Sequence, residues 1–169
     1  MPPYLNNTPL KEYPEIQKYE VNTGSGAASF NLALTFALQL PDEDIVYFVE
    51  DDFCHLLNSS QILEEGFKLG ASYVTLYVHP DKFISPKNGG NPEVDEDGGY
   101  LTKIYRGETE IFYMVNSTTM TFASKVKTLK EDEFIMRKWT IGSYPNDYQM
   151  FLELRDKGRA LMCPVNTYS

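Results

Sequence analysis

Cysteine is scarce in this sequence, and the two that occur, Cys54 and Cys163, are too far apart to give the spacing of a metal site. We therefore expect reduced thiols, as in intracellular proteins, and no disulfide framework. No apolar run approaches the length needed to cross a membrane, and the first residues, Met-Pro-Pro-Tyr, do not read as a signal peptide. These absences predict a cytoplasmic protein without a transmembrane segment.

Basic residues are also few. There are 15 Lys and Arg against 24 Asp and Glu, which gives a formal net charge of −9. No Lys/Arg cluster is present to neutralise phosphates, which argues against a nucleic-acid or anionic-membrane surface. A ligand that carries phosphate would need a metal ion to offset its charge.

The composition is otherwise that of an ordinary globular domain. The 169 residues are 42% hydrophobic and 23% charged, which suffices for one sizeable core. We find no internal repeat and no linker composition, so residues 1–169 are expected to form a single domain.

The most informative stretch is an apolar run, residues 45–49, that ends in three carboxylates, Glu50, Asp51 and Asp52 (the acid triplet). Five consecutive apolar residues predict a strand buried on both faces, as at the centre of a parallel sheet. The acids then lie at its carboxyl end, where open α/β sheets bind ligands. Because crowded acids repel one another, a divalent cation is their natural partner. The alternative is that they cap the next helix or contact only water.

Strand and helix patterns alternate along the first half of the chain. This alternation predicts right-handed parallel crossovers, hence an α/β fold with a mostly parallel sheet, helices on both faces and a small antiparallel hairpin. The expected strands are residues 17–21, 45–49, 73–78, 100–105, 110–115 (extended by 117–123) and 160–165, and the expected helices are 27–40, 62–69, 131–139 and 147–157.

Four short motifs follow one another along the chain. They are Asn22-x-Gly24, Asn31 in the following helix, the acid triplet, and Pro145-Asn146-Asp147 at the start of a helix that ends at Gly158. This series resembles the GT-A class of nucleotide-sugar glycosyltransferases (family 2-like or related, including virus-encoded members), in which the triplet would replace an Asp-x-Asp motif. The resemblance covers about residues 17–169. It implies a Rossmann-like GT-A fold and transfer of a sugar from a nucleotide diphosphate sugar, with UDP favoured, to a hydroxyl of a glycan or glycoconjugate.

The resemblance also implies roles for the acid triplet. Asp52 would contact Mn²⁺ or Mg²⁺ directly, and the metal would neutralise the charge that develops on the diphosphate. Glu50 would bind the ribose hydroxyls or reach the metal through water. Asp51 would be the spacer of the motif within the donor-binding site.

Asp147 is the candidate general base, which would take the proton of the acceptor hydroxyl in an inverting reaction. Its structural alternative is an ordinary helix start, with Asn146 as the cap and Asp147 favoured by the helix dipole. Asn22 and Gly24 precede a helix whose backbone N–H groups could face a donor phosphate, or they form a plain turn. Asn31 belongs to the same donor-binding set, with a satisfied core amide as its alternative.

Three polar residues are expected on the acceptor side of the site. His79 follows the strand expected at residues 73–78, and it could contact the sugar or be structural. Thr118 and Thr119 lie in a Thr-rich stretch that would line the acceptor, or simply belong to a strand.

Two parts of the GT-A pattern are missing: the long apolar first strand and a His after the last strand. The chain therefore reads as a domain truncated at both ends. Two other functions stay open. One is a sugar-phosphate nucleotidyltransferase, although its Gly-rich basic loop is lacking, and the other is a non-catalytic remnant of the fold that binds a carbohydrate or a protein.

Overall fold

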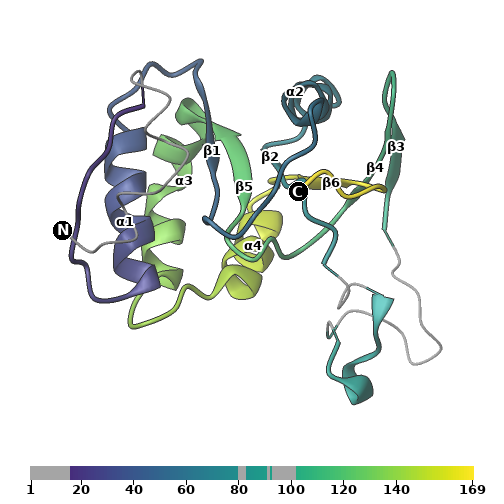
Figure 1. The fold of residues 1–169 in the computed structure, drawn as a ribbon. Helices are drawn as coiled ribbons and strands as arrows, with labels where there is room; N and C mark the ends of the chain where they lie inside the picture. The colour runs from purple at the N-terminus through teal and green to yellow at the C-terminus, as the bar shows by residue number, and fades with distance from the viewer. Residues whose placement is uncertain (1–15, 80–82, 91, 93–101) are drawn as a thin grey trace.

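The computed structural model describes residues 16–79, 83–90, 92 and 102–169. They form one six-stranded sheet with helices packed against it (Figure 1). The helices are α1 (Gly26–Ala37), α2 (Ser59–Lys68), α3 (Val126–Trp139) and α4 (Asp147–Asp156), with a short 3₁₀ helix at Pro86–Asn88. The strands are β1 (Ile45–Phe48), β2 (Tyr73–Val74), β3 (Ile104–Arg106), β4 (Ile111–Met114), β5 (Phe122–Lys125) and β6 (Leu161–Pro164).

The strands are arranged in the order β1-β5-β2-β6-β4-β3, and only β2 and β6 are parallel neighbours. The prediction of a mostly parallel, Rossmann-like GT-A sheet is therefore wrong, although the chain is α/β. The cause is β5, which enters between β1 and β2 and is antiparallel to both. We expected residues 117–123 to extend the preceding strand, but the chain leaves β4 and crosses to the far side of the sheet before β5 begins.

Three strands nevertheless run in the same direction. β1 and β2 are each antiparallel to β5, and β6 is parallel to β2. The carboxyl ends of β1, β2 and β6 therefore lie at one edge of the sheet (the carboxyl edge), and β5 begins at that edge. The carboxyl ends of these strands therefore lie together, as a ligand-binding edge requires, although the predicted topology is wrong.

β1 is an edge strand and not the central strand that its apolar run predicts. It pairs with β5 from Ile45–Lys125 to Phe48–Phe122, and no described strand pairs with its other side. Ile45 is 43% exposed and Phe48 only 7%. The strand expected at residues 17–21 has no regular structure. An unbroken apolar run does not show whether a strand is central or at the edge of a sheet. Here α1 covers part of the edge strand β1, which accounts for its apolar residues.

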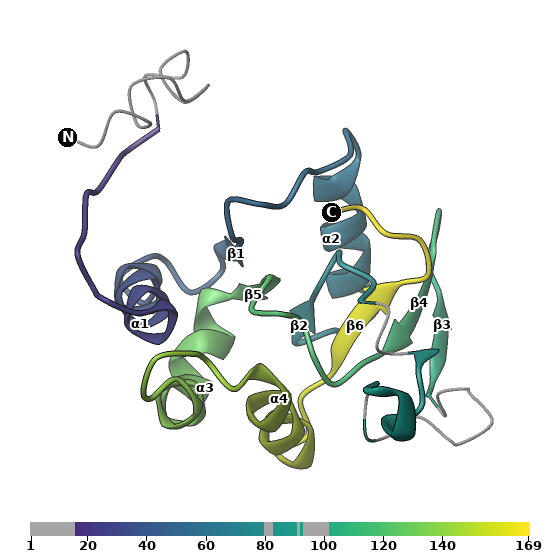
Figure 2. The same cartoon turned by 60° about the horizontal axis from the view of Figure 1, so that its bottom comes forward.

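Helices cover both faces of the sheet, as expected. α1, α3 and α4 lie on one face and α2 on the other (Figure 2). The first face carries a large core in which Leu34, Leu129 and Leu154 from the three helices are fully buried. On the second face, Ile62 and Leu63 of α2 pack against Val74, Phe112 and Met162. This burial of apolar surface is the main source of stability for the sheet.

The ends of the helices follow from local sequence. Ser25 caps α1 by accepting a hydrogen bond from the N–H of Ala28. Asn146 caps α4 by accepting one from Gln149, as its position before Asp147 predicts. Gly158 follows α4 with φ +89°, a conformation that favours glycine.

A buried aspartate joins the helices to the sheet. Asp132 of α3 is 1% exposed, and it accepts hydrogen bonds from Tyr73 of β2 and from Lys157 and Arg159, which follow α4. Burial raises the pKa of Asp132, but its basic partners and Tyr73 outweigh burial and lower the pKa below the ordinary value. A buried charge paired in this way fixes the relative position of three elements.

Two further carboxylates fasten the β3–β4 hairpin. Glu65 of α2 accepts hydrogen bonds from the N–H and the hydroxyl of Thr109 and from the N–H of Glu110. Glu110 in turn accepts bonds from the side chains of Asn166 and Tyr168. For both carboxylates burial raises the pKa, but the hydrogen bonds outweigh burial and lower it.

Candidate functional site

The acid triplet lies at the carboxyl edge, one residue beyond the end of β1, and its three residues are exposed. Partial burial raises the pKa of Glu50, and the neighbouring charges of Asp52, Asp51 and Asp147 raise it further. The fold thus brings Asp147, from near the end of the chain, into one electrostatic neighbourhood with the triplet. Like charges that act on one another favour the binding of a cation.

Asp147 is the first residue of α4 and holds a turn of the segment that leads into β5. Its Oδ2 atom accepts hydrogen bonds from the backbone N–H groups of Thr118 and Thr119, each at 2.8 Å. Thr119 and Met120 have φ values of 53° and 62°, in the left-handed region that L-residues adopt at a cost. The two charge-assisted bonds stabilise this strained turn. Because both use Oδ2, any proton would be accepted by Oδ1.

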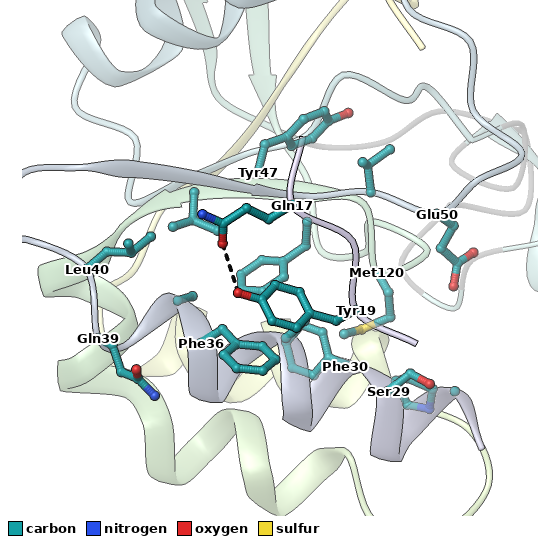
Figure 3. A pocket seen from close by; sticks show the side chains of 17 residues that line it. Gln17, Tyr19, Ser29, Phe30, Phe36, Gln39, Leu40, Tyr47, Glu50 and Met120 are labelled. Atoms are coloured by element: carbon teal, nitrogen blue, oxygen red, sulfur yellow. Dashed lines mark hydrogen bonds between the residues drawn. The ribbon is translucent and has the colours of Figure 1, made fainter. Parts of the chain in front are cut away.

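A cavity of about 840 Å³ (the β1 cavity) runs from this site along β1 (Figure 3). It lies between β1, α1 and part of the arm formed by residues 16–21. Glu50, Met120 and Pro145 are among its lining residues. The cavity is therefore lined by the first residue of the acid triplet, by the strained turn and by the segment that leads into α4.

The residues predicted to bind the donor are not all free to do so. Asn22 is exposed, and Gly24 lies in the turn before α1 with φ +76°. Asn31 uses both ends of its amide within the fold. It donates to the backbone oxygens of Ala27 and Thr140, and it accepts from Thr140 Oγ1 and from Arg137. These bonds match its alternative as a satisfied amide that joins α1 to the end of α3.

The residues predicted for the acceptor side lie at or near the carboxyl edge. His79 follows β2, is partly buried, and meets the ring of Tyr77 edge-on at 5.5 Å between centroids. Thr118 is 1% exposed, and its Oγ1 has no hydrogen-bond partner among the described residues. Thr119 donates its hydroxyl hydrogen to the carbonyl of Thr118. Thr118 and Thr119 are bonded to Asp147 through their backbone N–H groups, but the side chain of Thr118 is covered by protein.

The site offers carboxylate oxygens to a metal ion, but the protein alone does not supply a full coordination shell among the described residues. In the described parts of the chain, no group of three or more His, Cys, Asp or Glu side chains is arranged to hold a metal. Mg²⁺ and ions like it usually take one or two carboxylates and complete their shell with water and substrate phosphates. The hard oxygen atoms of Glu50 and Asp52 fit that kind of ion, and burial followed by repulsion from Asp52 raises the pKa of Glu50.

Sequence reasoning missed the β1 cavity and the strained turn. The cavity is lined by aromatic residues of α1 and of the arm, notably Phe30, Phe36 and Tyr19. The apolar, almost all-round pattern of α1 indicated burial, but part of that surface faces the cavity. The turn carried no signal, because Thr119 and Met120 are not residues that favour positive φ.

Neither protein-family models nor curated proteins give a match to this chain. The resemblance to GT-A enzymes therefore stays a prediction from the order of motifs. Within the described residues, no helix combines the length and the apolar character that crossing a bilayer requires.

Proposed function

We propose that this chain is a metal-dependent glycosyltransferase domain that moves a sugar from a nucleotide diphosphate sugar to a hydroxyl of a glycan or glycoconjugate, with inversion. The observation that carries the proposal is the position of the acid triplet at the carboxyl edge of the sheet, with Asp147 near enough to act on Glu50: burial first, and then the charges of Asp52, Asp51 and Asp147, raise the pKa of Glu50. Carboxylates at the edge of the sheet where strands end are the arrangement that a donor with a metal-bound diphosphate requires.

The triplet would hold the metal. Asp52 would bind Mn²⁺ or Mg²⁺ directly, and Glu50 would bind it through water or contact the ribose. When bound, the metal would neutralise negative charge on the diphosphate leaving group. Because the chain has a net charge of −9, this neutralisation would come from the cation and not from a basic surface.

Asp147 would carry the proton transfer. The acceptor oxygen forms a bond to the anomeric carbon as the bond from that carbon to the diphosphate oxygen breaks, and its electron pair leaves with the nucleoside diphosphate. The hydroxyl proton passes to Asp147 Oδ1, while Oδ2 keeps its bonds to Thr118 and Thr119. We also propose that the donor is a UDP sugar and that the protein is cytoplasmic.

Calorimetric titration with Mn²⁺ and a panel of nucleotide sugars tests the metal role. For Asp52→Ala we expect metal-dependent donor binding to fall below detection, because a direct ligand is removed. Asp156→Ala, a change at an exposed acid of α4, is the control and should bind like the unmodified chain. Unchanged donor binding in Asp52→Ala would reject the metal role, and no binding by the unmodified chain would favour a non-catalytic remnant.

A further inference from the structure

The wall of the β1 cavity is apolar throughout its buried part. Phe30, Ala37, Phe48 and Met120 line it and are 8%, 3%, 7% and 8% exposed, respectively. They come from α1, β1 and the strained turn. A ligand in contact with this wall would find no hydrogen-bonding side chain among these four residues, so the wall favours an apolar ligand.

Polar groups occur at the rim of the cavity. Gln17 and Gln39 are exposed lining residues, and the Gln17 amide oxygen accepts a hydrogen bond from the hydroxyl of Tyr19 at 2.8 Å. Tyr19 stacks on Phe36 with ring centroids 5.1 Å apart, yet the two residues are 63% and 43% exposed (Figure 3). This rim leaves aromatic surface open to water, which marks a site for apolar contact.

The two ends of the cavity differ. Gln39 and Leu40 lie at one end, and Glu50 lies at the other, near Met120 and Ser29 (Figure 3). The acid end is also the end at which Asp147 holds the strained turn. An occupant of the whole cavity would therefore have an apolar body and a head beside Glu50, the carboxylate among the lining residues. A negatively charged head is disfavoured there by repulsion. A neutral hydroxylated head can form hydrogen bonds to Glu50 and supplies the hydroxyl that the proposed transfer needs.

We propose that the β1 cavity binds the apolar chain of the acceptor, an alkyl-bearing molecule whose neutral hydroxylated head lies at the Glu50 and Asp147 end. This inference rests on the proposed function and names the acceptor class for it. A nucleobase fits less well, because its ring edges need hydrogen-bonding partners that the buried wall lacks. The volume of about 840 Å³ lies within the range of small-molecule sites.

Alkyl glucosides of increasing chain length test the inference. Butyl, hexyl and octyl glucoside, each below its critical micelle concentration, are titrated into the protein by calorimetry without donor. We expect Kd to fall by about fourfold for each added methylene, as burial of an alkyl chain predicts. A Kd that does not change with chain length would overturn the proposal.

Two aromatic variants locate the binding. Phe36→Ala removes part of the cavity rim and should weaken octyl glucoside binding roughly tenfold. Phe134→Ala is the matched control, because Phe134 is an 80% exposed phenylalanine on α3 and does not line the cavity. Equal effects of the two changes would overturn the proposal. Ala33→Trp, at an exposed lining position of α1, should abolish octyl binding by filling the cavity.

Nucleosides provide the competing occupant. Uridine and adenosine should not displace octyl glucoside, and displacement by either would assign the cavity to the donor and overturn the proposal. If metal-dependent donor binding is present but the chain-length effect is absent, this inference alone fails. If the chain-length effect is present without donor binding, the cavity assignment holds and the proposed transferase function fails.

Discussion

The carboxylate of Asp147 serves two requirements at the scale of a single residue. Its Oδ2 atom holds Thr118 and Thr119, so the strained turn at Thr119 and Met120 depends on it. The local sequence predicts that a helix starts at this position, and the resemblance to GT-A enzymes predicts that Asp147 is the general base. Both are compatible, because one oxygen is engaged and a second can accept a proton. Local sequence could not reveal the engaged oxygen, since its partners lie almost 30 residues earlier and meet it only through the fold.

Substitutions at Asp147 separate the two roles. Asp147→Asn keeps an oxygen that can accept both N–H groups but removes the proton acceptor, so turnover should fall by about 10² to 10⁴ with donor affinity retained. Asp147→Ala also leaves the two N–H groups without their acceptor, and the free energy of unfolding should drop by about 1–3 kcal/mol. Steady-state kinetics and urea unfolding measure these effects. Full turnover by Asp147→Asn would restrict the residue to its structural role.

At the scale of elements, periodicity identified most helices and strands but not their partners. The helices around residues 62–69 and 147–157 and the last strand are found near the expected positions, because their apolar spacing is local. The pairing of β5 with both β1 and β2 depends on where the chain goes after β4, which no local pattern records. For the same reason the link between α2 and the β3–β4 hairpin through Glu65 could not be foreseen, although Glu65 is 6% exposed and central to it.

The Glu65 link should make stability depend on pH. The folded pKa of Glu65 lies below its ordinary value of 4.5, so its contribution is present above about pH 4.5 and is lost as pH falls through the folded pKa. Glu65→Gln should lower the free energy of unfolding by about 1–3 kcal/mol at pH 7 and reduce its loss between pH 5 and 3. Urea unfolding across this range measures both. Glu64→Gln, at the exposed neighbouring position, is the control, and an equal effect there would contradict the assignment.

Across the whole molecule, the order of the strands places the last strand in the interior. β6 lies between β2 and β4, so residues 161–164 join these two strands into one sheet. The two cysteines report on this arrangement, because Cys163 of β6 is fully buried and Cys54, beyond the acid triplet, is exposed. From the sequence we expected only that both thiols are reduced. The difference in their exposure to solvent arises from the topology of the sheet.

Thiol labelling therefore tests the sheet order. In a Cys54→Ser variant, Cys163 should react with a thiol reagent only as fast as the molecule opens globally, because both of its neighbouring strands must separate to expose it. The labelling rate should rise with urea in parallel with the unfolding constant. In the reciprocal Cys163→Ser variant, Cys54 should react at once and independently of urea. Rapid labelling of Cys163 under native conditions would mean that β6 is not held between β2 and β4, and it would undermine the common carboxyl edge on which the candidate site depends.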